Sequence, residues 1–265
     1  MADSAIPQQV RPLLDWWLPR VRDLLGPDLR SVVLHGSVAL GDFMPGWSDV
    51  DVCVAMEEPL AERAAEAIGA LHDEMAARFI DGGAGGWRSG QAIEGPYIPV
   101  RLAGDPNAVA PCYTAGGTTR RYAVGHPITP FDRYMLAHFA RILSGPDVGF
   151  APPSPASLVE QARTDLRLVS EPHPDCLDAP IWLAGIMHWL ARSIVFWRDG
   201  VMLSKTAALE HEIAGGSPFA DAFGLALALR QEGSAACAGR LDELRADFLS
   251  VAPRAAALLE ELIRE

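Results

Sequence analysis

One short segment, residues 34–56, contains the residue types that chemistry on phosphates requires. Asp49 and Asp51 open an apolar run in it, and two residues apart on a strand their carboxylates would point to the same face. Their mutual repulsion favours a cation between them, and magnesium prefers a few carboxylates together with phosphate oxygens. The spacing therefore predicts a magnesium site at Asp49 and Asp51.

Gly36 and Ser37 precede the two aspartates and follow another short apolar run. Glycine lets the backbone approach a phosphate closely, and Ser37 offers a hydroxyl and an N–H at a strand-to-helix turn, where anions bind. Taken alone, a Gly-Ser pair is usually only a turn, and a lone Asp-x-Asp is usually a surface or cap feature. Because the two features seldom coincide at this spacing, together they predict a nucleotide site.

The elements that must position these residues follow from periodicity and turn signals. Strands are expected at residues 31–35, 50–56 and 91–102, the third at an edge or in a bulge because it contains Pro96 and Pro99. Helices are expected at residues 7–25, 61–79 and 131–143, with a flexible loop at 81–86. The first part of the chain is thus predicted to be an α+β domain, a small mixed sheet flanked by helices.

The most proline-dense stretch, residues 149–157, predicts a domain boundary, which divides the chain into residues 1–152 and 153–265. The second part shows no good strand signal. Its expected helices are residues 158–170, 181–197, 205–214, 219–230 and 235–264, the last with a break at Pro253. It is therefore predicted to be an all-α helical bundle.

Charge and composition narrow the classes of partner. The net charge of -12 argues against a grip on nucleic acid or on an anionic membrane, since both need Lys and Arg. Acidic residues that line one cleft would attract cationic small molecules, although the same balance also serves solubility. We expect a small-molecule acceptor and neither a nucleic-acid nor a membrane partner.

The four cysteines, residues 53, 112, 176 and 237, are scattered and form no metal-binding pair. Free buried thiols in a reducing cytosol are the simplest interpretation. Residues 1–11 lack the apolar run of a signal peptide, and the longest apolar stretch, residues 181–191, is too short to span a bilayer. A cytoplasmic monomer is expected.

The spacing of Gly36-Ser37 and Asp49-Val50-Asp51 resembles the polymerase-beta-like nucleotidyltransferase superfamily. Within it, GSVALGDFMPGWSDVDVCV is similar to the aminoglycoside adenylyltransferases that modify streptomycin and spectinomycin. Those enzymes have a helical second domain in which an Arg is followed thirteen residues later by a Lys at a helix start. Arg192 and Lys205 have that spacing. The resemblance covers most of the chain but is strong only in these two segments.

The resemblance implies transfer of a nucleoside monophosphate, AMP from ATP, to a hydroxyl of a small cationic acceptor such as an aminoglycoside, which gives antibiotic resistance. Asp49 and Asp51 would hold two magnesium ions. The triphosphate would be contacted by Gly36, Ser37 and Ser48 from the first domain and by Arg192 and Lys205 from the second. Lys205 is the only lysine of the chain; its alternative interpretation is a solvated residue after a helix cap.

The acceptor hydroxyl is a poor nucleophile, and a base that takes its proton speeds transfer. In the family a Glu on the next strand serves, and Glu94 in QAIEGPYIPV is the matching position. Gly95 and two prolines depart there from the β-branched run of a central strand. Asp81 and Asp105 are the alternative bases.

Carboxylates would also bind the cationic acceptor. Glu94 is one, and Asp175 and Asp178, with Glu171 beside them, are candidates in the second domain. Their alternative interpretation is a polar loop between helices. Trp182 stands where the family has another acidic contact, so the particular antibiotic is not defined.

Two further functions stay open. One is a nucleotidyltransferase that acts on another metabolite or on protein side chains. The other is a non-catalytic ligand-binding relative, which the joint presence of Ser37, Asp49, Asp51, Glu94 and Lys205 disfavours.

Overall fold

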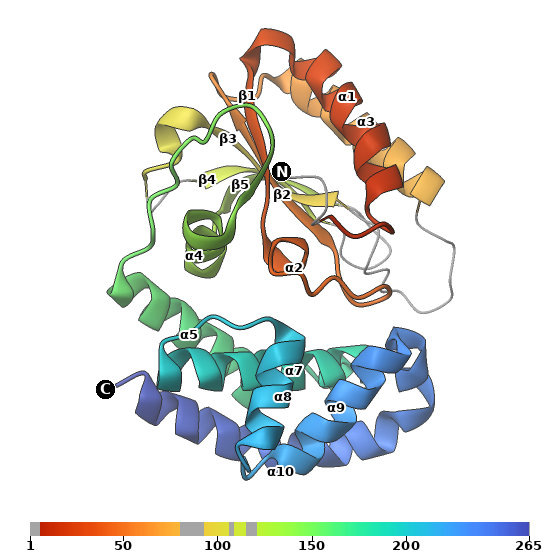
Figure 1. The fold of residues 1–265 in the computed structure, drawn as a ribbon, viewed down its shortest axis with the longest axis vertical. Coiled ribbons are helices and arrows are strands. Elements are labelled where there is room, and N and C mark those ends of the chain that lie inside the picture. The colour runs from red at the N-terminus through yellow and green to blue at the C-terminus, as the bar shows by residue number, and fades with distance from the viewer. Residues whose placement is uncertain (1–5, 80–92, 106–108, 115–120, 265) are drawn as a thin grey trace. The chain divides into compact units, whose positions relative to one another are not determined.

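The computed structural model describes residues 6–79, 93–105, 109–114 and 121–264. The chain divides into two compact units, Met1–Ser154 and Pro155–Glu265, which are described separately (Figure 1). The division falls inside the proline-rich stretch.

The first unit is built on a six-stranded sheet with the order β5-β4-β3-β2-β1-β6. Its strands are β1 (Leu29–Leu34), β2 (Val50–Met56), β3 (Ile93–Pro99), β4 (Val109–Thr114), β5 (Arg121–Pro127) and β6 (Arg141–Ser144). Strands β2 and β3 are parallel, and the other neighbouring pairs are antiparallel. The predicted α+β domain with a mixed sheet is confirmed.

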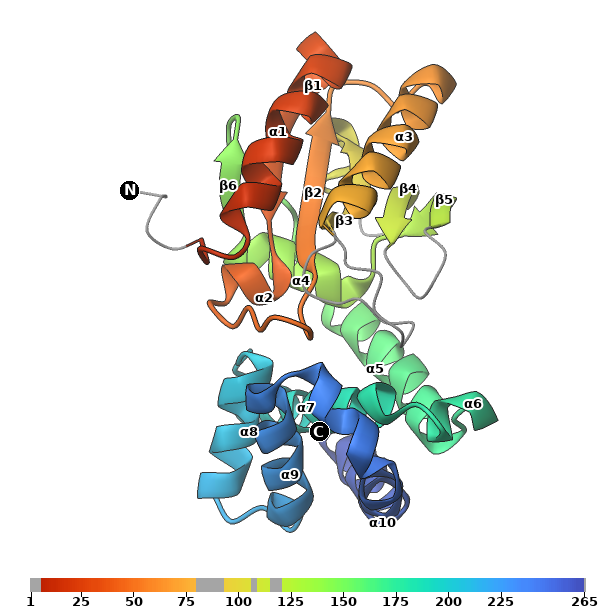
Figure 2. The same ribbon diagram turned by 90° about the vertical axis from the view of Figure 1, so that its right-hand side faces the viewer.

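The alternation of side chains along the strands divides the first unit into two cores. Val32 of β1 and Val52 of β2 belong to a cluster with helices α1 (Arg11–Leu25) and α3 (Glu62–Phe79). Figures 1 and 2 show these two helices side by side along the sheet. Val33 of β1 and Cys53 of β2, which are odd-numbered, form a second cluster with Ile98 of β3 and with Leu136 of helix α4 (Pro130–Phe139). Odd-numbered residues of β2 therefore face α4.

Two expectations for the first unit are wrong, and two of its strands were not predicted. Strand β3 lies between β2 and β4 and not at an edge, although its ladder with β4 is short and pairs only Gly95 with Tyr113 and Pro96 with Cys112. Strands β4 and β5 were not predicted. The helix expected at residues 131–143 ends at Phe139, and β6 follows it and pairs with β1.

The structure describes all of residues 155–264 in the second unit, and the regular elements there are helices without strands. Its helices are α5 (Pro155–Ser170), α6 (Pro174–Leu177), α7 (Pro180–Asp199), α8 (Lys205–Ala214), α9 (Ala220–Glu232) and α10 (Leu241–Leu262). The apolar stretch 181–191 lies in α7, which packs against α8, α9 and α10 and forms the core of the unit. No helix in the described part of the chain is long and apolar enough to cross a membrane.

Helix α10 begins later than predicted and does not break at its proline. Residues Ser234–Arg240 form a 3₁₀ helix, so α10 begins at Leu241. It then continues through Pro253 without a break. The carbonyl that loses its donor belongs to Leu249, a residue that is 59% exposed, so this turn of the helix faces water, which can replace the missing hydrogen bond. The expected break is therefore absent.

The cysteines only partly match their prediction. Cys53 and Cys237 are free and buried, and burial raises the pKa of the Cys237 thiol to about 11. Cys176 is free but only half-buried, because it lies on the short surface helix α6. The side chain of Cys112 lies outside the described part of the chain.

Candidate nucleotide-binding and catalytic site

Gly36 and Asp51 lie in close contact where β1 ends and β2 begins. The His35 N–H donates to the Asp51 carbonyl at 3.0 Å, and the chain then turns at Gly36, with φ of 60°, into helix α2 (Gly36–Ala39). A Cβ on Gly36 would lie 1.9 Å from Oδ2 of Asp51. Only glycine fits both the backbone angle and the space, so the Asp51 carboxylate lies directly against the main chain of the turn.

Asp49 lies immediately before β2, whose first residue is Val50. Both aspartates are half-buried, whereas Val50 and Val52 are fully buried in the α1 and α3 cluster. This alternation places the two carboxylates on the same side of the chain, as the spacing predicts. The Ser37 hydroxyl donates to the Asp49 carbonyl at 3.4 Å, which ties the two ends of the motif together.

Glu94 is brought to the aspartates by the parallel pairing of β2 and β3, in which it is the register partner of Asp51. Gly95, with φ of 138°, makes this pairing possible, because a Cβ there would lie 1.7 Å from the Val52 carbonyl oxygen. The departure from a β-branched run thus has a steric reason.

Of the two alternative bases, Asp81 lies outside the described residues. The charge of Asp105 acts on the guanidinium of Arg133. Burial lowers the pKa of this guanidinium, and the negative charge of Asp105 partly opposes that effect.

Two further residues of this site were not predicted, His35 and Asp132. Burial lowers the pKa of His35, and the charges of the Asp132 and Glu94 carboxylates act in the opposite direction. Within the described structure, Nε2 of His35 is buried and makes no hydrogen bond. The sequence carried no signal for Asp132, because it begins α4 beside the capping residue Thr129, which is an ordinary structural pattern.

The donor set fits magnesium only as a pair of carboxylates completed by phosphate oxygens. In the described part of the chain, no three His, Cys, Asp or Glu side chains are grouped to hold a metal by themselves. Magnesium usually binds one or two carboxylates together with substrate phosphates, and Asp49 and Asp51 provide that number. Ser48 is buried, and its hydroxyl accepts from the Met44 N–H at 3.0 Å, which holds the loop before β2.

In the second unit, the predicted Arg192 and Lys205 gather around His188. This histidine is buried on α7, and its Nε2 lies 3.2 Å from the Ala226 carbonyl oxygen. Burial lowers the pKa of His188 well below its usual value, and the charges of Lys205, Arg230 and Arg192 lower it further. The histidine is therefore neutral, and the charges of three cations act on it.

Arg230 was missed by the sequence reasoning. It is 1% exposed on α9, and its Nε donates to the Thr206 hydroxyl at 2.9 Å. Thr206 directly follows Lys205 in the first turn of α8, which Ser204 caps by accepting from the Ala207 N–H. Arg230 thus fixes the position of the turn that carries Lys205. An Arg in the apolar segment FGLALALRQ was the available signal.

The predicted acceptor contacts lie elsewhere in this unit. Asp175 and Asp178 lie at the short helix α6, are largely exposed, and pair with His173 and Arg245 respectively. Trp182 packs against the ring of Phe248. The role of these carboxylates stays a prediction.

Comparisons with known proteins concern the domain family and the fold of the chain. Residues 14–81 match the family model of the nucleotidyltransferase domain, and they include most of α1 and the whole of β1, the Gly36 turn, β2 and α3. The chain therefore has an N-terminal nucleotidyltransferase domain followed by a helical region.

The whole chain is similar in fold to the spectinomycin adenyltransferase AAD(9) from Enterococcus faecialis, a crystal structure with ATP and spectinomycin. The TM-score is 0.59, the alignment covers 90% of this chain and 99% of that one, and the sequence identity is 13%. At this identity the likeness concerns the fold. No curated protein sequence matches the chain.

Proposed function

We propose that this protein transfers a nucleoside monophosphate, AMP from ATP, to a hydroxyl of a small cationic acceptor such as an aminoglycoside. One observation carries the proposal. The Asp51 carboxylate lies against the Gly36 main chain, and Glu94 is its register partner on the adjacent strand. The turn that we propose binds phosphate, the carboxylate that would bind metal and the residue that would act as the base therefore lie on adjacent elements.

In this proposal the residues of the first unit have three different roles. Asp49 and Asp51 would hold two magnesium ions, which when bound neutralise phosphate charge and stabilise the reacting oxygens. Gly36 and Ser37 would contact the triphosphate with N–H and hydroxyl donors. Glu94 would take the proton of the acceptor hydroxyl.

The second unit supplies positive charge. Arg192 and Lys205 would bind the triphosphate, and Arg230 holds the turn from which Lys205 projects. The neutral state of His188 leaves the positive charge of this cluster on these three side chains.

A cationic acceptor agrees with the net charge of -12 and with the carboxylates that surround His35. The proposal includes a cytoplasmic monomer that gives antibiotic resistance and has no nucleic-acid or membrane partner. Asp175 and Asp178 are proposed acceptor contacts.

The test is incubation with each nucleoside triphosphate, magnesium and a panel of aminoglycosides and spectinomycin, followed by mass spectrometry. We expect one acceptor to gain the mass of a nucleoside monophosphate, with release of pyrophosphate. The D49N variant should bind the acceptor and fold normally but transfer nothing. If the wild type binds ATP with magnesium yet modifies no member of a broad panel, the transferase proposal fails.

A further inference from the structure

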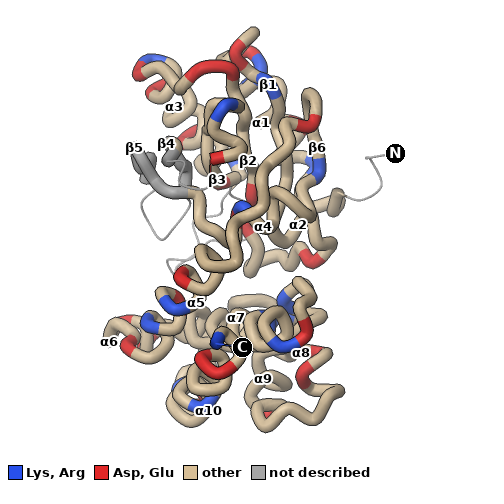
Figure 3. The backbone as a smooth tube through the Cα atoms, turned by 90° about the vertical axis from the view of Figure 1, so that its left-hand side faces the viewer, with Lys and Arg blue, Asp and Glu red and all other residues tan. Residues whose placement is uncertain are grey.

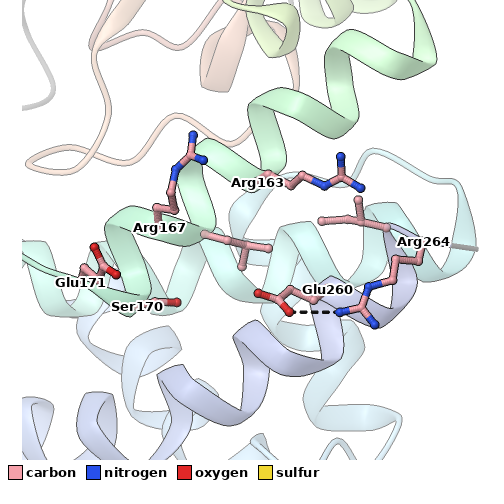
Figure 4. Close-up of a pocket in the computed structure, with 8 residues that line it drawn as sticks. Arg163, Arg167, Ser170, Glu171, Glu260 and Arg264 are labelled. Atoms are coloured by element: carbon pink, nitrogen blue, oxygen red, sulfur yellow. Dashed lines mark hydrogen bonds and ion pairs between the residues drawn. The ribbon is translucent and has the colours of Figure 1, made fainter.

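A cavity of about 400 Å³ lies between helix α5 and the C-terminal end of α10 (Figure 4). Arg163, Leu166, Arg167 and Ser170 are spaced at three and four residues, so helical geometry places them on one face of α5. Ile263 and Arg264 follow the end of α10 and complete the other side. The size falls within the usual range for sites of small molecules.

Positive charge is concentrated at this cavity, although the protein as a whole is acidic. Arg163 and Arg167 lie one helical turn apart and repel each other, and Arg264 adds a third cation. Figure 3 marks the arginines of α5 in blue. Two carboxylates, Glu171 and Glu260, only partly balance these three charges.

The partners of the three arginines differ. Arg264 pairs with Glu260 at 3.2 Å, and Arg167 donates to the Thr164 hydroxyl at 3.1 Å. Arg163 makes no hydrogen bond or ion pair with the residues that the structure describes, and in Figure 4 its side chain extends toward the end of α10 where Arg264 lies. A guanidinium offers a fork of donors that matches phosphate oxygens, so an anion at this point would relieve the repulsion.

We propose that this cavity binds a small phosphate ester that carries hydroxyl or amino groups. Its phosphate lies between Arg163 and Arg264, at one end of the cavity. Ser170 and Glu171 lie at the other end in Figure 4, where their oxygens accept hydrogen bonds from the rest of the ligand. The proposal uses no residue of the proposed nucleotide site, so it stands or falls independently of the transferase function.

The test is calorimetry on the full chain with glucose 6-phosphate as the probe and with glucose and citrate as comparisons. Glucose 6-phosphate should bind, and neither glucose nor citrate should bind comparably. The R163A variant should weaken binding about tenfold, the effect of losing one charge-assisted hydrogen-bonded pair. The E260Q variant should strengthen it about two- to fivefold, because Arg264 loses its competing carboxylate.

The matched control is R63A, which removes an exposed helical arginine of α3 and should leave binding unchanged. Because Arg163 and Glu260 are exposed, all variants should keep the wild-type melting temperature within a few degrees. Equal binding of glucose or citrate, no effect of R163A, or loss of binding in a K205A variant would overturn the proposal. The last result would place the phosphate at the proposed nucleotide site.

Discussion

The change Gly36→Ala tests whether the close contact between the Gly36 turn and Asp51 supports activity. The added Cβ would lie 1.9 Å from Oδ2 of Asp51, about 1.5 Å short of ordinary contact at 3.4 Å. The carboxylate must therefore move by more than 1 Å or the turn must open. A misplacement of about 1 Å at a reacting centre can cost about 10²-fold in rate.

A second effect of Gly36→Ala comes from the backbone. With φ of 60°, an alanine adopts a left-handed conformation that costs about 1–2 kcal/mol of folding stability. Gly41 provides the matched control, because its φ is 72° and a Cβ there meets nothing within 4 Å. Gly41→Ala introduces similar strain without touching Asp51.

The assay measures transfer by pyrophosphate release with the identified acceptor, ATP–magnesium affinity by calorimetry, and unfolding by denaturant. We expect both variants to lose about 1–2 kcal/mol of stability, and only Gly36→Ala to lose about 10²-fold in turnover. If Gly36→Ala stays within a few-fold of Gly41→Ala in turnover and in ATP affinity, Asp51 does not act against this turn and the site is wrongly assigned.

Other predictions concern the base, the cation cluster and the response to pH. Glu94→Gln should reduce transfer about 10²–10⁴-fold with little change in ligand affinity; unchanged turnover would remove Glu94 as the base. Thr206→Val should raise the KM for ATP more than it lowers kcat, because Arg230 then no longer holds the turn of Lys205; an unchanged KM would contradict that positioning role. The hydrogen bond from Arg198 lowers the pKa of Asp199 below 3.8, so this group stabilises the fold above that pH, and the stability is lost as the pH falls through the lowered pKa. Asp199→Asn should flatten the acid side of the unfolding free energy against pH, and an identical profile would refute the linkage.

The fold class and the likeness to the nucleotidyltransferases were predicted from the sequence and are confirmed. Both depend on short-range patterns. The period-two alternation around Val50 and Val52 defines the strand and the face that the aspartates share. The cap at Ser204 defines the start of α8 at Lys205. Such features depend on a residue and its near neighbours in the chain, so they can be predicted from the sequence alone.

Strand pairing and helix packing required the tertiary structure. Glu94 becomes the partner of Asp51 only through the register of two strands far apart in the chain. That register is decided by which faces are buried, and Gly95 allows it by leaving room for the Val52 carbonyl. Strand β6 was mistaken for the end of a helix, because four residues are too few to show a distinctive period. These residues form a strand because they pair with β1, which lies far away in the chain.

The sequence also could not show which charged side chains lie near one another in the folded chain. The charge of Asp132 on α4 acts on His35, and Arg230 on α9 donates to Thr206 beside Lys205, although each pair is far apart in the chain. The sequence by itself determined which residues could bind metal, phosphate and protons, because those properties belong to the side chains. Only the tertiary structure decided which of them act together, because burial and through-space charge depend on distances that packing alone sets.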